Sequence, residues 1–418
     1  MSRKGKPDWK LLAMALALWV LLNPARATAG EYERPGNRNV AEFFGPELIS
    51  GRHYRLRETV FCDGTLNQYT VDSNFGTFEV TGDGALRKLI REIHAISILR
   101  QVSGSESYAD SLGKAAEKPL RFGEHLIQDP LDTVNEVSRG VYRTVENAYT
   151  SATTKRSPHQ DSQAEELLAL SAYKRQNAYR LGVDVYSSNP VLQKELNRVG
   201  WSAVAGSLSF SAAMMPLGTV GTVVSTSRTG QQVMEALREE PPSALRRINE
   251  QRLVDMGVST LTAKHFLDHP IFSPRHQTII TASLGALQRV RGKDGFIRFI
   301  LSAENEASAN SFMVLAEILR GYQKKISPLR QITLRSDLVI ASAENGYLFI
   351  PFPADYGLWT ERMDHTLSPL VKGYRTSDPK AKLELWVTGT LSLFAREELK
   401  RLGVLVIENV DQKMEFMD

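Results

Sequence analysis

The 418-residue chain has a single cysteine, Cys62, so it cannot form an internal disulfide bond. Its apolar content of 42% is ordinary for a globular protein, so we expect a core that needs no disulfide bonds. The chain also has no lysine- and arginine-rich run with interleaved aromatic residues, and no repeat of solenoid length. These absences argue against a disulfide scaffold, a nucleic-acid binder and a repeat protein.

The first 29 residues have the layout of a secretory signal peptide. An apolar run extends from Leu11 to Leu22 and is too short to span a bilayer comfortably. Ala27 and Ala29 supply the small residues that a signal peptidase reads, and no cysteine marks a lipoprotein signal. An uncleaved N-terminal anchor is the alternative. The basic residues before the run are Arg3, Lys4, Lys6 and Lys10.

Removal of this segment changes the charge of the chain. The whole sequence has 51 Lys and Arg residues against 47 Asp and Glu, a net charge of +4. Residues 1–29 hold five of the basic residues and one of the acidic residues, which leaves 46 of each in the mature chain. A nucleic-acid binder needs a surplus of cations to displace the counterions of the phosphates. The balanced charge therefore predicts that nucleic acid is not a partner.

The remaining pattern predicts an α+β protein. Strand-like runs at 53–61, 66–71 and 77–81 are separated by turn residues, which predicts an antiparallel meander followed by a helix with apolar residues at helical spacing from Leu86 to Leu99. Residues 30–50, rich in Gly, Pro and Asn, form a lead-in. A mostly helical middle, in which Pro190 restarts a helix, and a C-terminal mixed α/β portion follow. In that portion, 331–341 and 346–352 are expected as strands, and 382–387, 391–402 and 403–410 as a strand–helix–strand unit. The expected segments are a signal peptide (1–29), a β-meander plus helix (30–102), a polar linker with helical pieces (103–163), a helical domain (164–327) and a mixed α/β portion (328–418).

His265 and His269 are candidates for a metal or acid–base site. They are four residues apart, so a continuous helix would place both imidazoles on one face. The pair lacks the intervening glutamate of the zinc-peptidase motif, and Pro270 follows directly. A structural or solvent-facing cluster is the alternative.

Glu304 is the candidate carboxylate for catalysis. The sequence predicts one long helix from Gly295 to Gln323, in which Glu304 interrupts the apolar stripe together with Glu306 and Asn310. A carboxylate near an apolar face needs a cationic partner or a raised pKa. The alternative is a structural ion pair with one of the nearby cations, Arg298 and Arg320.

Two further features have simple structural explanations. Cys62 lacks the flanking signature of a cysteine hydrolase, with His53 and His94 the nearest bases in sequence, and a structural thiol is favoured. The turn at 387–392 passes from a strand into a helix, which suits an anion, but Thr390 or Ser392 acting as an N-cap explains the same residues.

Residues 200–227 carry no charge and are rich in small residues, with Pro216 inside. Small residues at short intervals let helices approach closely, in water or in lipid. The abundance of serine and threonine favours a buried helix pair, and contact with a membrane is the alternative.

The stretch from Leu181 to Gln193 (LGVDVYSSNPVLQ), followed by the uncharged segment, resembles uncharacterised exported proteobacterial proteins. The stretch from Asp72 to Val80 (DSNFGTFEV) is similar to them too. The resemblance implies a location in the cell envelope and no particular reaction or cofactor.

Together these features predict an exported periplasmic or secreted protein that acts by binding or assembly. An envelope protein or the membrane surface is the expected partner, and residues 200–227 are the expected contact with a membrane. The alternative is a periplasmic hydrolase that uses Glu304 or a site at His265 and His269, so the sequence leaves open whether the chain is an enzyme.

We predict that export removes the signal peptide after Ala29. N-terminal sequencing of the chain purified from the periplasm of a Gram-negative host should then start at Gly30. Recovery of a cytosolic chain that retains Leu11–Leu22 would contradict this prediction.

Overall fold

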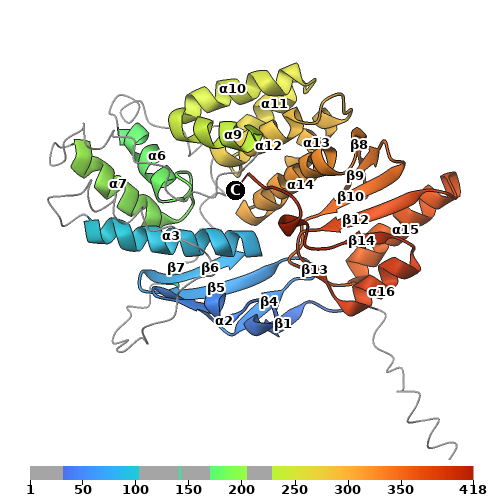
Figure 1. Ribbon diagram of the computed structural model, residues 1–418, viewed down its shortest axis with the longest axis horizontal. Coiled ribbons are helices and arrows are strands. Elements are labelled where there is room, and N and C mark those ends of the chain that lie inside the picture. The colour runs from blue at the N-terminus through green and yellow to red at the C-terminus, as the bar shows by residue number, and fades with distance from the viewer. Residues whose placement is uncertain (1–31, 103–140, 143–169, 205–227, 418) are drawn as a thin grey trace, which may run out of the picture.

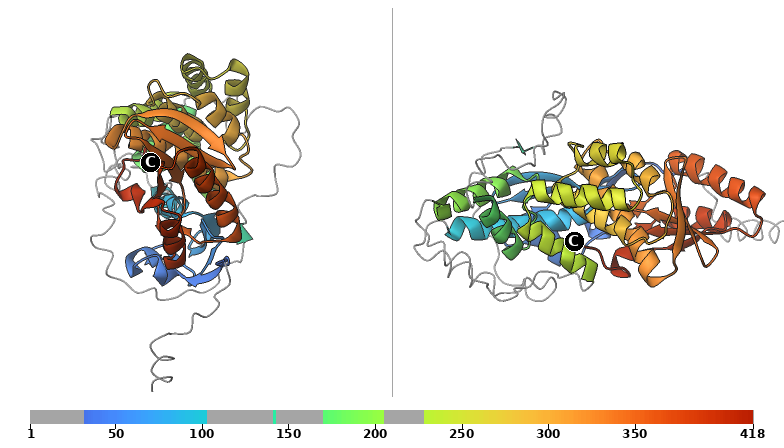
Figure 2. Two further views of the ribbon diagram at one scale, coloured as in Figure 1. Left: turned by 90° about the vertical axis from the view of Figure 1, so that its right-hand side faces the viewer. Right: turned by 90° about the horizontal axis from the view of Figure 1, so that it is seen from above.

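The computed structural model describes residues 32–102, 141–142, 170–204 and 228–417. Two large sheets lie at different places in the molecule, and helices fill the space between and around them (Figure 1). Two short strands form a third sheet. The middle helices lie between a helix pair at one end of the long axis and the second sheet at the other (Figure 2). The α+β class predicted from the sequence is confirmed.

The first sheet, sheet A, is the expected antiparallel meander with extra strands at its edges. The long strand β5 pairs with β6 on one side and with β3 and β4 on the other. The segment 30–50, expected as a lead-in, also contributes strands, η1 and α2. The elements are β1 (Gly36–Asn39), η1 (Val40–Glu42), α2 (Pro46–Ile49), β2 (Ser50–Gly51), β3 (Tyr54–Leu56), β4 (Thr59–Cys62), β5 (Asn67–Ser73), β6 (Gly76–Thr81) and β7 (Val141–Tyr142).

Helix α3 (Asp83–Val102), which the sequence predicted to follow the meander, covers one face of sheet A. Its first half buries Leu86, Ile90 and Ile93 against sheet residues such as Val71. Its second half packs on α6 (Leu170–Arg180) and α7 (Pro190–Val204) through a separate apolar cluster that includes Leu99. The helix therefore contacts two parts of the protein with one apolar stripe.

The middle of the chain is helical, and its largest apolar core surrounds α12 and α14. The elements are α9 (Arg228–Glu239), α10 (Pro242–Asp255), α11 (Thr260–Leu267), α12 (Pro274–Gly285), α13 (Lys293–Ile300) and α14 (Glu306–Lys325). The prediction of one helix over 295–323 is wrong, because residues 301–305 separate α13 from α14. Asn305 ends this break as the N-cap of α14, where its side chain accepts a hydrogen bond from the Ser308 N–H.

The second sheet, sheet B, lies between α14 on one face and two helices on the other. Its order is β14-β12-β10-β9-β8, antiparallel from β8 to β10 and parallel from β10 to β14. Tyr322 of α14 stacks on Phe349, with ring centroids 4.1 Å apart. The elements of this part of the chain are β8 (Leu329–Arg335), β9 (Leu338–Ala343), β10 (Tyr347–Phe352), β11 (Tyr356–Gly357), α15 (Glu361–Ser377), β12 (Lys382–Val387), β13 (Thr390–Leu391), α16 (Leu393–Arg401), β14 (Leu405–Ile407) and η2 (Val410–Gln412). Strands β11 and β13 pair with each other in parallel, outside sheet B.

The predicted strand β12 is confirmed, as is the strand–helix–strand unit that β12, α16 and β14 form. The run 331–341, expected as one strand, is split between β8 and β9 by a turn in which Ser336 and Asp337 have positive φ. The sequence did not predict α15.

The two sheets are joined by backbone hydrogen bonds between the β4–β5 turn and the segment after β10. The Asp355 N–H donates to Thr65 O at 2.8 Å, and the Leu358 N–H donates to Gly64 O at 2.9 Å. The same segment contacts the turn after β12, where the Gly389 N–H donates to Ala354 O at 2.7 Å. Sheet A and sheet B are therefore joined where the β4–β5 turn lies against the segment after β10, which we call the chain crossing.

Gly389→Ala should destabilise the protein, because a Cβ atom there would lie 2.1 Å from Asp355 O. We expect a loss of about 1–3 kcal/mol in the free energy of unfolding, measured with urea. The control is Gly373→Ala in α15, where nothing lies within 4 Å of the added atom. That change should be neutral or stabilise by up to about 1 kcal/mol. Equal effects of the two substitutions would contradict the prediction.

Candidate functional site

The candidates from the sequence do not form a common catalytic arrangement. Glu304 is exposed in the loop before α14, where its N–H donates to Ser308 Oγ. The prediction that it lies near an apolar helix face is wrong because α14 begins only at Glu306. Of its two expected partners, Arg298 pairs with Asp294 at 2.8 Å and Arg320 with Glu317 at 3.7 Å.

The helical premise for His265 and His269 is also wrong. Helix α11 ends at Leu267, so only His265 lies on it, and that side chain is exposed. The His269 Nε2–H donates to Leu301 O at 3.1 Å, and burial lowers the pKa of His269. In the part of the chain that the structure describes, no three His, Cys, Asp or Glu side chains are grouped to hold a metal ion.

Cys62 and Ser392 have the structural placements that the sequence favoured. Cys62 is buried in β4 with Sγ 3.5 Å from Tyr356 O, and burial raises the pKa of its thiol. A raised pKa disfavours the thiolate that a nucleophile requires. Ser392 is the N-cap of α16 and accepts from the Ala395 N–H at 2.9 Å. Most of the uncharged segment, residues 205–227, lies outside the described residues.

Three other clusters stand out, and the first is an ionic network around Lys88. The Lys88 ammonium lies 3.3 Å from Asp184 Oδ2 and 3.4 Å from Glu306 Oε1. The Ser188 hydroxyl donates to the second oxygen of Glu306, and Asn189 Nδ2 donates to Glu92 Oε2 at 3.0 Å. The network connects α3, the segment between α6 and α7, and α14.

Burial and opposite charge compete within this network. Burial alone would raise the pKa of Asp184 and of Glu306, but Lys88 and the other cations and hydrogen bonds around them together outweigh it, and both pKa values are lowered. Burial opposes the charge on Lys88, yet the two carboxylates hold its pKa above the usual value. All three groups are therefore charged at neutral pH, and the paired charges fit a structural role. The stretch LGVDVYSSNPVLQ noted in the sequence contains three residues of this network, Asp184, Ser188 and Asn189. It is the part of the sequence from which the network could have been suspected.

The second cluster is the acid pair of Asp355 and Asp83, which lies at the chain crossing where sheet A and sheet B are joined. Asp355 accepts hydrogen bonds from the Asn67 N–H at 2.9 Å and from the Asp83 N–H at 3.0 Å. Asp83 in turn accepts from the Tyr69 hydroxyl. Burial, with the nearby Asp83 charge, raises the pKa of Asp355 to about 8. Both oxygens of Asp355 are occupied by backbone amides, so this pair also fastens α3 to the chain crossing.

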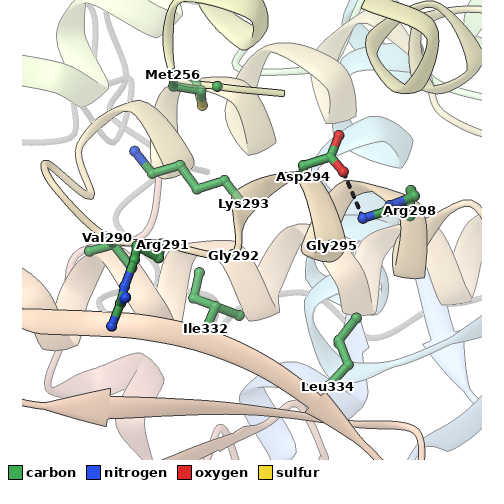
Figure 3. A pocket seen from close by; sticks show the side chains of 11 residues that line it. Met256, Val290, Arg291, Gly292, Lys293, Asp294, Gly295, Arg298, Ile332 and Leu334 are labelled. Carbon is green, nitrogen blue, oxygen red and sulfur yellow. Dashed lines mark ion pairs between the residues drawn. The ribbon is translucent and has the colours of Figure 1, made fainter. Parts of the chain in front are cut away.

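The third cluster lines an open pocket of about 500 Å³ between the start of α13 and strand β8 (Figure 3). Lys293 is 7% exposed, and it has no hydrogen-bond or ion-pair partner among the residues that the structure describes. Burial lowers the pKa of Lys293. A buried ammonium without a partner is costly, so its position at a pocket indicates a place for a negative charge. The pocket residues are Met256, Gly257, Val290, Arg291, Gly292, Lys293, Asp294, Gly295, Arg298, Ile332 and Leu334.

Gly292 fixes the geometry of this pocket. It has φ of 92° and is the N-cap of α13, with no side chain to cap the helix. A Cβ atom there would lie 2.1 Å from Ile332 O, so only glycine fits against β8. The neighbouring Arg291 is held by backbone bonds on both sides, its N–H donating to Arg330 O and its carbonyl accepting from the Ile332 N–H at 2.8 Å.

Residues 292–295, the N-cap and first turn of α13, line the pocket, so the positive end of the helix dipole lies at its edge. Figure 3 shows Lys293 and Arg291 on one side of this helix start and the Asp294–Arg298 ion pair on the other. The prediction of one helix over 295–323 gave no sign of this pocket, because it leaves out the helix start at Lys293. The signal that would have found it is the stretch Arg291-Gly292-Lys293-Asp294-Gly295, with two glycines around a basic residue.

No protein-family model matches the chain, and no curated protein or solved structure is significantly similar to it.

Lys88→Met should destabilise the protein, because it leaves Asp184 and Glu306 without their shared cation. We expect a loss of about 3 kcal/mol in the free energy of unfolding. The matched control is Arg57→Met, which removes an exposed ion pair with Asp72 and should cost less than about 1 kcal/mol. Equal losses for the two variants would show that the network is not structural.

The acid pair predicts a pH dependence of stability. The folded protein keeps a proton on Asp355 up to pH of about 8, whereas the unfolded chain releases it near pH 4. Stability is therefore lost as pH rises through this window, because the folded state binds more protons. Between pH 7 and 8.5, wild type should lose about 1 kcal/mol relative to Asp355→Asn in urea titrations.

The control for this prediction is Asp72→Asn, at an exposed carboxyl whose pKa is lowered by its hydrogen bond to Arg57. This variant should keep the wild-type pH slope. If the stability curves of wild type and Asp355→Asn run parallel from pH 7 to 8.5, Asp355 does not hold the proton.

Proposed function

We propose that the chain is an exported binding protein of the cell envelope that holds a small anion in the α13 pocket. The observation that carries the proposal is Lys293, a residue only 7% exposed, which lacks a partner among the described residues and borders a pocket of about 500 Å³. Export rests on the signal peptide expected at 1–29, which lies outside the described residues.

The pocket has the chemistry of an anion site. The uncapped start of α13 offers backbone N–H groups, and anions bind at helix N-termini because the dipole and the free amides both favour negative charge. Lys293 adds a fixed charge whose hydration is already lost on folding. A bound anion would supply the partner that Lys293 lacks, so the free energy of anion binding is more favourable there than at an exposed lysine.

Binding rather than catalysis is what the pocket supports. Its ionisable groups are three cations and one carboxylate, Asp294, whose pKa is lowered by hydrogen bonds from Ser259 and by Arg298. A lowered pKa makes Asp294 a weak base, and it is occupied by these partners. The alternative of a hydrolase that uses Glu304, His265 or His269 has less support, since Glu304 is exposed in a loop and His269 is hydrogen-bonded to Leu301.

A contact with a membrane or an envelope protein through residues 200–227 stays a prediction. At its described start, Trp201 is 49% exposed on α7. The helices within the described residues include none with the length and hydropathy of a membrane span.

Inorganic phosphate should stabilise the protein through Lys293. At constant ionic strength set with chloride, phosphate at ten times its dissociation constant should raise the free energy of unfolding by about 1.4 kcal/mol. Lys293→Met should abolish the effect while the variant stays folded, because methionine fills the same buried space. The measurement is thermal unfolding of the full chain with and without phosphate.

The control is Lys372→Met, which removes an exposed lysine of α15. This variant should respond to phosphate as wild type does. An equal response of Lys293→Met and wild type would reject the α13 pocket as an anion site.

A further inference from the structure

The charges around the α13 pocket favour a ligand with two negative charges. Arg298 and Asp294 form an ion pair at 2.8 Å and cancel one another. Lys293 and Arg291 remain, both on the other side of the helix start (Figure 3). The net charge of the lining is therefore +2, and a dianion would balance it. Arg291 Nη2 donates a long hydrogen bond of 3.4 Å to Gln331 Oε1. This weak hydrogen bond does not neutralise the charge of Arg291.

The arrangement suits a single compact headgroup rather than two separate negative groups. Lys293 and the free amides of α13 lie at one end of one helix, whereas the charged end of Arg291 points away from that of Lys293 (Figure 3). A phosphoryl group offers several acceptor oxygens on one atom for the ammonium and the amides, and it carries about −1.5 to −2 charge near neutral pH.

The size and the apolar lining of the pocket indicate an organic group attached to that headgroup. A volume of about 500 Å³ lies in the range of pockets that hold small organic ligands, about 300–1,000 Å³. Four apolar side chains line it, and Leu334 is 37% exposed although it is a leucine. These side chains are Met256, Val290, Ile332 and Leu334.

We propose that the ligand of the α13 pocket is a small organic phosphomonoester. Its phosphoryl group lies at the start of α13 beside Lys293, and its organic group covers Ile332 and Leu334. This inference rests on the proposed anion site and adds the class of its ligand.

The test compares four probes by isothermal titration calorimetry on the full chain: phenyl phosphate, inorganic phosphate, benzoate and succinate. Phenyl phosphate should bind about tenfold more tightly than inorganic phosphate, because its ring removes apolar surface from water. It should also bind more tightly than benzoate, which has one charge, and succinate, which has two separated charges.

Two variants separate the two halves of the ligand. Leu334→Ser should weaken phenyl phosphate on the order of threefold and leave inorganic phosphate unchanged, since Leu334 lies at the surface and contacts only the ring. Lys293→Met should weaken both phosphates.

The outcomes distinguish this inference from the proposed function. If benzoate, succinate or inorganic phosphate binds as tightly as phenyl phosphate and Lys293→Met still abolishes binding, the anion site stands and the phosphomonoester is rejected. If none of the four probes binds, both proposals are rejected. Tighter binding of phenyl phosphate that depends on both Lys293 and Leu334 supports both.

Discussion

The shared contact of Lys88 with Asp184 and Glu306 fastens three parts of this protein to one another. Lys88 lies on the helix that covers sheet A, Asp184 lies between α6 and α7, and Glu306 begins α14, which packs on sheet B. A single ammonium thus sets the position of α3 against the core of the middle helices. The side chains of Lys88 and Asp184 are 18% and 7% exposed, so the contact is little screened by solvent.

The comparison of two buried lysines connects this architecture to the proposed function. Lys88 has lost much of its hydration and has two carboxylates in return, which raise its pKa. Lys293 is similarly buried, but only desolvation acts on it and its pKa is lowered. In the folded protein Lys88 is therefore paired with carboxylates, whereas Lys293 is unpaired among the described residues and lies beside an open pocket. The uncapped helix start and Gly292, fixed against Ile332 O, give that pocket a defined shape.

The sequence predicted elements where one local pattern decides the structure. The apolar stripe of α3, the strand Lys382–Val387 and the restart of a helix at Pro190 follow directly from periodicity and from proline. The failures occur where tertiary contacts decide. Residues 301–305 have helical composition, yet Asn305 caps a new helix there, which leaves Glu304 exposed and brings Glu306 to Lys88. The network joins Lys88 to residues 96 and 218 positions away in sequence, and no local pattern pairs them. The α13 pocket was missed for the same reason, because it depends on a backbone contact between Gly292 and β8.

The most direct measurement is a pH titration of the Lys293 amine, monitored by NMR of the chain with 13Cε-labelled lysine. The Lys293 signal is identified as the one that Lys293→Arg removes. In the free protein the pKa of Lys293 should lie below the usual value for lysine. Saturation with phenyl phosphate should raise that pKa, because a bound dianion favours the charged amine. A Lys293 signal that titrates identically with and without phenyl phosphate would contradict an anion held at the start of α13.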